Sequence, residues 1–168
     1  HWNSAAPIEN LRRRAAIIAA IRAFFAGKDV LEVDTPVMSN AAVSDPYIDT
    51  IECRYQPLVG GDVEMKYLQS SPEYAMKRLL ASGSGPIYQI SKAFRNGEVG
   101  RRHNPEFSML EWYRPGFDDH KLMDEVAALV QLTTGCGRSE KLSYRELFLR
   151  HLEIDPHSAT VAELRTVA

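Results

Sequence analysis

Residues 94–113 read FRNGEVGRRHNPEFSMLEWY and carry more charged and aromatic side chains than an ordinary hairpin needs. The segment PIYQISKAF (86–94) leads into this stretch, and EFSMLEWY (106–113) leaves it. Both segments have the composition of β-strands, and the polar residues between them form a loop. The stretch therefore predicts two antiparallel strands joined by a long basic loop.

Arg95 closes the first of these strands, where a sheet would hold its guanidinium group in place. A planar group with several N–H donors suits a phosphate better than a flexible lysine does. The loop adds Arg101, Arg102 and His103, which can grip the far end of a polyphosphate. This spacing is compatible with a triphosphate site, but arginines in a hairpin loop are also often simply solvated.

Two further residues of the stretch fit a nucleotide base. Phe107 at the start of the return strand can stack on a planar ring, and Glu98 can accept a hydrogen bond from an exocyclic amine. A strand phenylalanine is also often a core residue. Spacing alone therefore leaves both interpretations open, an ATP site without a glycine-rich P-loop or an ordinary hairpin.

The composition limits the class of protein. The chain has 168 residues, 45% hydrophobic and 25% charged, enough for one domain with a core. A net charge of −2 excludes a strong overall field that would attract nucleic acid, so an anion must bind at a local site. No apolar run approaches the roughly 18 residues of a membrane span. Cys53 and Cys136 lack metal-ligand spacing, which favours a reducing cytoplasm.

The order of elements predicts an α+β fold. Helices are expected at 8–26, 72–81 (with Pro72 as first helical residue) and 118–134, with two short ones after Ser143 and beyond Ser158. Strands are expected at 30–39, broken by Pro36, and at 50–58, 64–69, 86–94 and 106–113. These elements predict an antiparallel sheet with flanking helices packed on one side.

The stretch SATVAELRTVA (158–168) stops inside a helical pattern. Thr160 and Glu163 have the spacing of a capping box, which opens a helix. Since the first residue is not Met either, we expect the chain to be part of a longer protein.

Three segments resemble the class II aminoacyl-tRNA synthetases in the right order. Residues 94–113 resemble motif 2 of that family, and the form HNPEF is similar to its lysyl branch. VLEVDTPVMS (30–39) resembles motif 1, with Pro36 at the motif's proline, and SSPEYAMKRLL (70–80) resembles the segment between the motifs. The resemblance covers roughly residues 10–117 and implies a class II synthetase-like catalytic core.

Within the family, SPEYAMKRLL, GRRHNPEF and LEWYRPGFDDHKLMDEV are most similar to the lysyl-tRNA synthetase paralogues that ligate (R)-β-lysine to elongation factor P. This resemblance implies ATP and Mg²⁺, an amino-acid substrate that is (R)-β-lysine or lysine, and elongation factor P as partner. It also implies a homodimer through the motif 1 region, at 17–37. The low net charge argues against tRNA as a partner.

The resemblance gives the phosphate-binding residues their roles. Arg95 would contact the α-phosphate, His103 the γ-phosphate side, with Arg102 as the weaker candidate for the same position. Phe107 would stack on adenine. The family's adenine-contacting glutamate usually lies at the position where this chain has Gly97. If the flexible glycine lets the neighbouring Glu98 reach adenine, Glu98 takes that role. Otherwise Glu98 is a solvated loop residue.

Four residues would form the amino-acid pocket, by the same resemblance: Ser71, Glu73, Glu111 and Tyr113. The last two lie two apart on one strand, so they share a face, and a carboxylate with a phenol suits an ammonium group. Trp112 should point to the opposite face, into the core. Both helix-start residues also have a purely structural interpretation. Glu73 could be there only to stabilise the helix dipole, and Ser71 only to serve as the N-cap of the helix.

The implied reaction is adenylate formation followed by transfer to an amine of the partner protein. Catalysis of adenylate formation depends mainly on positioning the substrates and stabilising the developing charge, so no nucleophilic side chain is expected. Nothing after Phe117 resembles motif 3, the family's glycine-rich stretch with an ATP-binding arginine. By the same resemblance, the family's main metal-binding acids belong to the half that is absent here. We therefore expect residues 1–168 to be the N-terminal part of the catalytic domain, incomplete and inactive alone. Because few residues precede the motif 1 helix, we expect no anticodon-binding domain. The alternatives are part of a true lysyl-tRNA synthetase, or a non-catalytic synthetase-like binding module.

Overall fold

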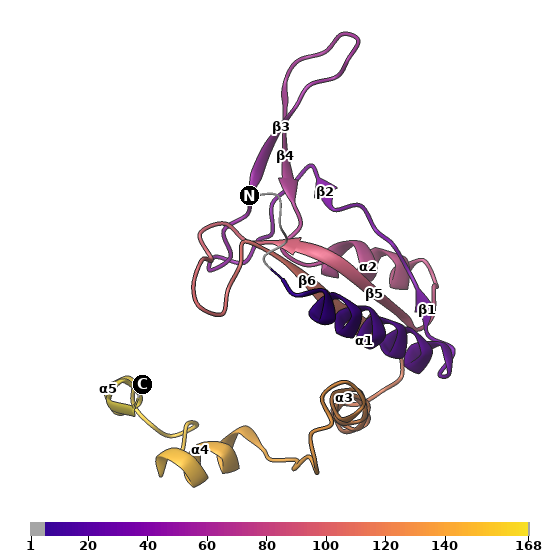
Figure 1. Ribbon diagram of the computed structural model, residues 1–168. Coiled ribbons are helices and arrows are strands. Elements are labelled where there is room, and N and C mark those ends of the chain that lie inside the picture. The colour runs from indigo at the N-terminus through magenta and orange to yellow at the C-terminus, as the bar shows by residue number, and fades with distance from the viewer. Residues whose placement is uncertain (1–5, 168) are drawn as a thin grey trace. The chain divides into compact units, whose positions relative to one another are not determined.

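A computed structural model describes residues 6–167, which form two compact units divided after Asp118. The elements of the first unit are α1 (Ile8–Ala26), β1 (Leu31–Glu32), β2 (Met38–Ser39), β3 (Glu52–Tyr55), β4 (Glu64–Leu68), α2 (Glu73–Ala81), β5 (Ile87–Phe94) and β6 (Glu106–Tyr113) (Figure 1). Those of the second are α3 (Asp119–Thr134), α4 (Tyr144–Leu152) and α5 (Val161–Val167). The predicted α+β composition is confirmed at this level.

The predicted hairpin of residues 86–113 is the centre of the first unit. Strands β5 and β6 pair antiparallel over their whole length, from Ile87 opposite Tyr113 to Phe94 opposite Glu106. Strand β1 pairs with the other edge of β5, but in parallel, with Leu31 opposite Ile87. The sheet is therefore mixed, and the prediction of a purely antiparallel sheet was wrong in this respect. A parallel pair requires a long crossover, which the chain makes through β2–β4 and α2.

The predicted strand at 30–39 is two short strands in different sheets. Before Pro36, β1 joins the sheet of β5 and β6; after it, β2 pairs with β4 in a second, antiparallel sheet of order β2-β4-β3. Proline has a fixed φ and no N–H to donate, so it interrupts the ladder between the two. Within the predicted segment only Leu31–Glu32 and Met38–Ser39 are strand, and the prediction missed the change of sheet.

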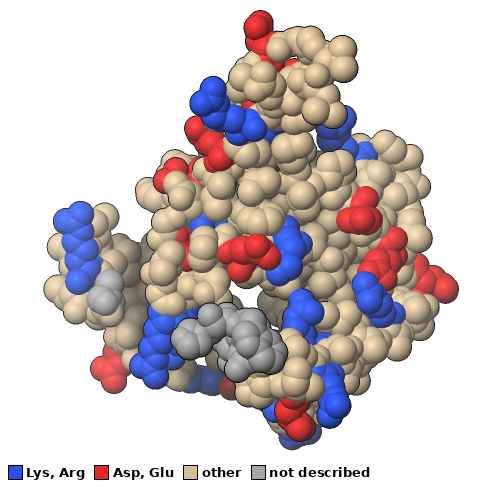
Figure 2. Space-filling view, turned by 45° about the horizontal axis from the view of Figure 1, so that its top comes forward, with Lys and Arg blue, Asp and Glu red and all other residues tan. Residues whose placement is uncertain are grey.

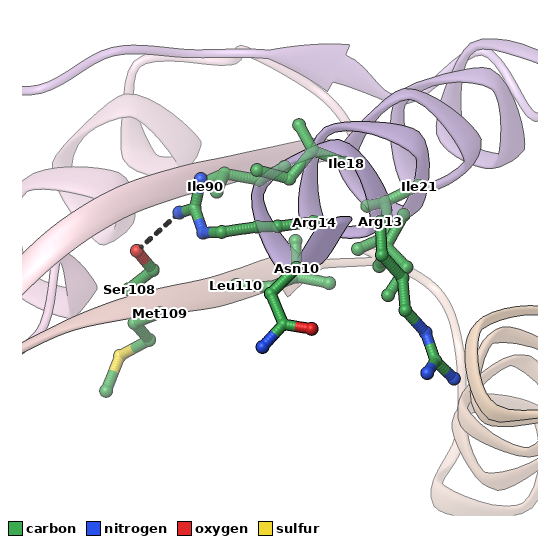
Figure 3. A pocket seen from close by; sticks show the side chains of 10 residues that line it. Asn10, Arg13, Arg14, Ile18, Ile21, Ile90, Ser108, Met109 and Leu110 are labelled. Atoms are coloured by element: carbon green, nitrogen blue, oxygen red, sulfur yellow. Dashed lines mark hydrogen bonds between the residues drawn. The ribbon is translucent and has the colours of Figure 1, made fainter. Parts of the chain in front are cut away.

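Helix α1 covers one face of the central sheet. The ring of Phe25, which is fully buried, stacks on Tyr88 with centroids 4.4 Å apart and lies 5.6 Å from Trp112. The side chain of Trp112 thus points into the core on the face away from Glu111, as predicted. Farther along, Arg14 Nη2 donates to Ser108 Oγ at 2.9 Å (Figure 3).

Figure 3 looks into a cavity of about 350 Å³ between α1 and the hairpin strands. Its lining includes the isoleucines Ile17, Ile18, Ile21 and Ile90. Ile18 and Ile90 lie near Arg14 in this view, whereas the guanidinium group of Arg13 points away from Ser108. The apolar side chains of α1 therefore face the sheet across this cavity, and Phe25 is the residue of the helix that is buried.

The start of α2 adjoins the opposite face of the same sheet. Ser71, just before this helix, bonds to Glu111, and strand geometry sends Glu111 and Trp112 to opposite faces. The prediction that the helices pack on one side was therefore wrong. Successive β5 residues 87–89 are all buried, because a central strand covered on both faces needs no polar side.

Strands β3 and β4, at the two strands predicted for 50–58 and 64–69, form a hairpin with Glu52 opposite Tyr67 and Tyr55 opposite Glu64. The turn contains Gly60 at φ +60° and Gly61 at φ +109°, conformations that L-residues with a Cβ rarely adopt. At its tip, Leu58 and Val59 are almost fully exposed. The hairpin is visible as the arm labelled β3 and β4 in Figure 1.

The second unit consists of the three predicted helices. Helix α3 begins at Asp119, one residue after the predicted start. The capping box of α4 is present: Ser143 Oγ accepts from the backbone N–H of Glu146, and the Glu146 carboxylate accepts from Ser143 N–H. Thr160 and Glu163 form the same reciprocal pair before α5. Local sequence therefore fixes the starts of both helices.

Candidate functional site

Five of the predicted site residues line one cavity of about 600 Å³ in the first unit: Ser71, Glu73, Arg95, Glu111 and Tyr113. They come from the start of α2, the end of β5 and the second half of β6. The cavity lies on the face of the sheet away from α1. The structure thus brings together the whole predicted amino-acid pocket and the predicted α-phosphate ligand, although they are spread over more than forty positions of the chain.

Glu111 is the centre of the polar wall. Tyr113 OH donates to its Oε1 at 2.6 Å, and Ser71 Oγ donates to its Oε2 at 3.1 Å. Burial first, and then the hydrogen bond to this carboxylate, raise the pKa of Tyr113 above its usual range. The phenol is therefore a neutral donor that fixes Glu111, whose remaining lone pairs are available to an ammonium group.

Ser71 serves the helix and the pocket together. Its hydroxyl oxygen accepts from the Glu73 N–H at 3.0 Å while its proton goes to Glu111. The alternative that Ser71 is merely the N-cap was wrong, because that position belongs to the next residue, although the Ser71 hydroxyl does bind the first N–H of α2. We predicted Pro72 as the first helical residue; in the structure it is the N-cap, and α2 begins one position later, at Glu73. The difference is a single residue at a helix end.

The Glu73 carboxylate has a partner on its own helix. Lys77 Nζ donates to Glu73 Oε1 at 2.5 Å, an i,i+4 ion pair, and this bond raises the pKa of Lys77. Both side chains are about half exposed, so the pair is weak. Glu73 therefore remains able to exchange Lys77 for a substrate ammonium at the cavity wall.

Arg95 has donors left over at the rim of the cavity. Its backbone N–H donates to Pro105 O, which closes the hairpin pairing, and its guanidinium group lies 5.3 Å from the ring centroid of Phe107. Glu98 approaches Nη1 at 3.7 Å, a loose ion pair. Arg95 Nε is buried and has no hydrogen-bond partner among residues 6–167. An anion at this position would meet a positive group whose hydrogen-bonding capacity is not yet used.

Phe107 lies opposite Ala93 in the register of β5 and β6, on the cavity face of the sheet. One face of its ring is turned to the guanidinium group of Arg95, a cation–π contact. It does not line the 600 Å³ cavity. Stacking of Phe107 on adenine stays a prediction. The structure places the ring beside Arg95, the predicted α-phosphate ligand.

The basic loop is a tight turn outside the cavity. Gly100 and His103 exchange two backbone hydrogen bonds, and Arg101 and Arg102 occupy the exposed turn between them. Neither Arg102 nor His103 contacts Arg95 in any recorded bond among the described residues, so their predicted contacts to the far phosphates stay predictions. In the view of Figure 2, acidic and basic side chains are intermixed over the visible surface.

Gly97 decides where Glu98 can lie. Its φ of +74° is a left-handed conformation that favours glycine. This turn brings Glu98 back towards Arg95 rather than out along the strand. A Cβ at Gly97 would meet no atom within 4 Å, so backbone conformation and not space keeps a glycine here. The structure thus gives Glu98 a contact at the site, and its contact to adenine stays a prediction.

Sequence reasoning missed part of the cavity wall. Residues 43–46 and 48 line it, in the segment between the predicted strands 30–39 and 50–58, for which no role was predicted. Ser44 Oγ and Tyr74 OH lie 2.7 Å apart, which ties this loop to α2, and Asp45 Oδ1 accepts from Tyr47 N–H. The Asp-Pro pair at 45–46 is a turn signal. It could have marked an ordered loop, but nothing in it indicates which cavity the loop would line.

The part of the chain that the structure describes holds no group of three or more His, Cys, Asp or Glu side chains able to bind a metal ion. The described residues therefore do not fit the expected Mg²⁺ as a set of protein ligands. No helix among these residues is long and apolar enough to span a membrane.

Comparison with known proteins places these residues in a family context. The family model of the tRNA synthetases class II (D, K and N) matches residues 2–153. A protein of Yersinia enterocolitica serotype O:8 named elongation factor P–(R)-β-lysine ligase is 55% identical over 167 residues, 99% of this chain. Proteins of the same name from Yersinia pestis (strain Pestoides F) and Yersinia pseudotuberculosis serotype O:1b are 56% identical over 167 residues. The aligned part is 51% of each relative, so the chain spans about half the length of the curated relatives it matches.

Proposed function

The chain belongs to the class II tRNA synthetases of the D, K and N group, and on that premise we propose that the whole protein is a ligase that activates (R)-β-lysine or lysine with ATP and transfers it to elongation factor P. Residues 1–168 would supply the first part of its catalytic domain. The other half of the relatives' length would carry the motif 3 region and ligands for Mg²⁺.

One observation carries the proposal. A single cavity has carboxylates in its wall, at Glu73 and Glu111, and a guanidinium group at its rim, Arg95. A diamino acid needs anionic partners for its ammonium groups, and the triphosphate that activates it needs a cation beside the reacting carboxylate. The distribution of charge in the cavity supports both substrates of an adenylate-forming ligase.

In the first step a carboxylate oxygen of the amino acid attacks the α-phosphorus of ATP. The bond to the leaving phosphate breaks, and pyrophosphate departs with its electron pair. Arg95 would donate to the α-phosphate oxygens as their charge grows, and Phe107 would hold the adenine ring in line. His103, with Arg102 behind it, would steady the γ-phosphate, and Glu98 would take the adenine-side position that Gly97 leaves vacant.

In the second step the ε-amine of a lysine in elongation factor P attacks the carbonyl carbon of the adenylate. AMP leaves with the electron pair of the broken acyl–phosphate bond, and the amine proton passes to water. Ser71, Glu73, Glu111 and Tyr113 would hold the ammonium groups of the amino acid during both steps. Lysine and (R)-β-lysine present the same two charge types, so the relatives' name supports the choice of (R)-β-lysine.

The proposal extends to assembly and location. The motif 1 region would form a homodimer, and the exposed apolar residues Leu31 and Val37 in the segment 17–37 support this. With a translation factor as acceptor the protein would work in the cytoplasm. The low net charge of −2 favours a protein partner over tRNA, and the face seen in Figure 2 has acidic and basic side chains intermixed.

The test is the intact mass of the acceptor. The full-length protein is incubated with ATP, (R)-β-lysine and unmodified elongation factor P. The intact mass of elongation factor P is then measured by mass spectrometry. A gain of one β-lysyl group is expected. An unchanged acceptor together with lysine attached to tRNA would instead identify a lysyl-tRNA synthetase.

A second candidate is a synthetase-like module that binds but does not catalyse. The observation in its favour is Gly97, at the position where the family usually has its adenine-contacting glutamate. Thermal unfolding with and without ATP separates the two candidates. An unchanged midpoint with ATP, together with an unmodified acceptor, would favour the module.

A further inference from the structure

Gln89, in the middle of β5, has a buried amide group with an unused donor. Its side chain is 1% exposed, and Nε2 has no hydrogen-bond partner among the residues that the structure describes. Burying an unpaired donor reduces stability, whereas an apolar side chain of the same length would fill the space without that loss. A polar group kept in this position requires an explanation in terms of what it binds.

The other end of the amide is fixed. Thr35 Oγ1 donates to Gln89 Oε1 at 3.0 Å, and Thr35 is itself buried, with 7% of its surface exposed. Thr35 lies between β1 and Pro36, in a part of the chain whose position the parallel pairing of β1 and β5 determines. Because Oε1 is held by Thr35, the two N–H groups of Nε2 are kept free for a different partner.

The register of the sheet identifies the neighbouring group. Gln89 pairs with Glu111 across β5 and β6, so the two side chains stand next to each other on one face. Directly opposite residues of antiparallel strands have Cβ atoms about 5 Å apart. This is the face that carries the amino-acid cavity, so Gln89 lies in the sheet directly beside the residue that forms the centre of the cavity's polar wall.

Glu111 can use another donor when the cavity fills. Each of its oxygens accepts one recorded hydrogen bond, from Tyr113 and from Ser71, and each has a second lone pair. An ammonium group drawn to the carboxylate competes for those lone pairs and changes its orientation. Hydrogen bonds of this kind are often absent without substrate and form in the complex.

We propose that Gln89 is a positioning residue for the amino-acid substrate, an inference that rests on the proposed function. Held by Thr35, its Nε2 donates to the Glu111 carboxylate when an ammonium group binds, and so fixes the carboxylate that receives the substrate. Gln89 acts through Glu111 and touches neither the amino acid nor ATP. Its role is therefore confined to amino-acid binding.

The experiment compares two dissociation constants in the full-length protein, one for (R)-β-lysine and one for ATP, by calorimetric titration. Gln89→Met keeps the size of the side chain and removes both the acceptor and the donors. We expect it to weaken (R)-β-lysine binding by about 10-fold, the usual effect of losing one hydrogen bond to a charged group, and to leave ATP binding unchanged. A merely structural role would weaken both.

A second pair of variants tests the fixed end of the amide. Thr35→Val removes the hydroxyl that holds Oε1, and Thr35→Ser keeps it. We expect Thr35→Val to weaken (R)-β-lysine binding and Thr35→Ser to bind (R)-β-lysine with the wild-type affinity. Ser91→Ala is the matched control, because Ser91 is a buried polar residue two positions along the same strand and outside the cavity. Its binding constants should equal those of the wild type.

Wild-type affinity for (R)-β-lysine in Gln89→Met would overturn the positioning role, as would an equal loss for ATP. If Gln89→Met does not fold, the Thr35 pair decides alone, and equal affinities of Val and Ser overturn the proposal. A wild-type protein that binds ATP but neither lysine nor (R)-β-lysine would refute the proposed function itself, and Gln89 would lose its role together with it.

Discussion

Arg95 lies where the sequence predicts it, directly after a strand, and its contact with the α-phosphate stays a prediction. The sequence places a guanidinium group at the end of a strand, and the structure shows it at the cavity rim with a buried Nε that no described residue binds. Its nearest anion, Glu98, is a loose neighbour at 3.7 Å. An incoming phosphate therefore has only a weak competitor for the arginine.

The first prediction replaces Arg95 by Ala in the full-length protein. We expect ATP–pyrophosphate exchange to fall by roughly 100-fold, the usual effect of removing one preorganised donor from developing charge. Arg101→Ala is the control, because Arg101 is an exposed cation of the same hairpin. Exchange rates that fall equally in both variants would mean that general positive charge, and not Arg95, is required.

Tyr88 is a second residue with a strongly perturbed environment, on the α1 face of the sheet. It is buried against Phe25, and its hydroxyl donates to Glu32 Oε2 at 2.9 Å. Burial first, and then this hydrogen bond, raise the pKa of Tyr88 to about 12. The folded protein therefore keeps this phenol neutral where the unfolded chain already loses its proton.

The second prediction concerns alkaline pH. The unfolded chain releases the Tyr88 proton near pH 10.0 and the folded chain near 12, so unfolding is increasingly favoured between these values, by up to about 1.4 kcal/mol per pH unit. Urea unfolding of the wild type and Tyr88→Phe, from pH 9 to 11, measures the effect. The stability advantage of the wild type should shrink as the pH rises. An advantage that stays constant would show that Tyr88 titrates normally when folded.

At the scale of elements, local sequence decides where helices start and tertiary pairing decides what strands do. The capping boxes before α4 and α5 are complete in the structure, and their residues are three apart in sequence. By contrast, β1 and β2 are adjacent in sequence and belong to different sheets. A hydrogen bond across a sheet joins residues far apart in sequence, so no local pattern specifies it.

The third prediction concerns the cap of α4. Ser143→Ala removes the hydroxyl that accepts from Glu146 N–H and leaves only the bond from Ser143 N–H to the Glu146 carboxylate. We expect this change to lower the stability of the second unit by about 1 kcal/mol. Amide hydrogen exchange reports the change, because it separates α3–α5 from the sheet. Faster exchange is expected in α4 and unchanged exchange in β5 and β6.

Ser143→Thr is the matched control, because threonine keeps the hydroxyl and caps nearly as well as serine. Exchange in α4 at the wild-type rate in Ser143→Ala would show that the helix depends on its packing and not on its cap.

At the scale of the whole molecule, exposed apolar residues lie in the segment predicted to form a dimer. Leu31 is 56% exposed although it belongs to a strand of the central sheet. Clustered exposure of large apolar side chains is typical of surfaces that another polypeptide covers. The hairpin tip is exposed in the same way, which provides a comparison outside the predicted interface.

The fourth prediction is a change of oligomeric state. Leu31→Arg should convert the full-length protein from a dimer to a monomer in sedimentation velocity, because an unpaired charge in an apolar interface opposes association. Leu58→Arg, at the fully exposed hairpin tip, is the control and should leave the dimer intact. A wild-type monomer, or a Leu31→Arg dimer, would contradict an interface at residues 17–37.

The amino-acid sequence by itself determined the helices and their caps, the hairpin of β5 and β6, and the face to which Glu111 and Tyr113 point. These features depend on residues close together in sequence or on the two-residue period of a strand. Family resemblance supplied the choice of Arg95, Ser71 and Glu73, and the cavity that they line agrees with it.

Only the tertiary structure decided the parallel pairing of β1, the opposite-face placement of α1 and α2, the contact of Glu98 with Arg95, and the free donor of Gln89 beside Glu111. Each of these arises from contacts between segments brought together by the sheet, or from the left-handed backbone at Gly97. Long-range packing chooses among arrangements that have the same local pattern, and that choice is what turned scattered polar residues into one cavity.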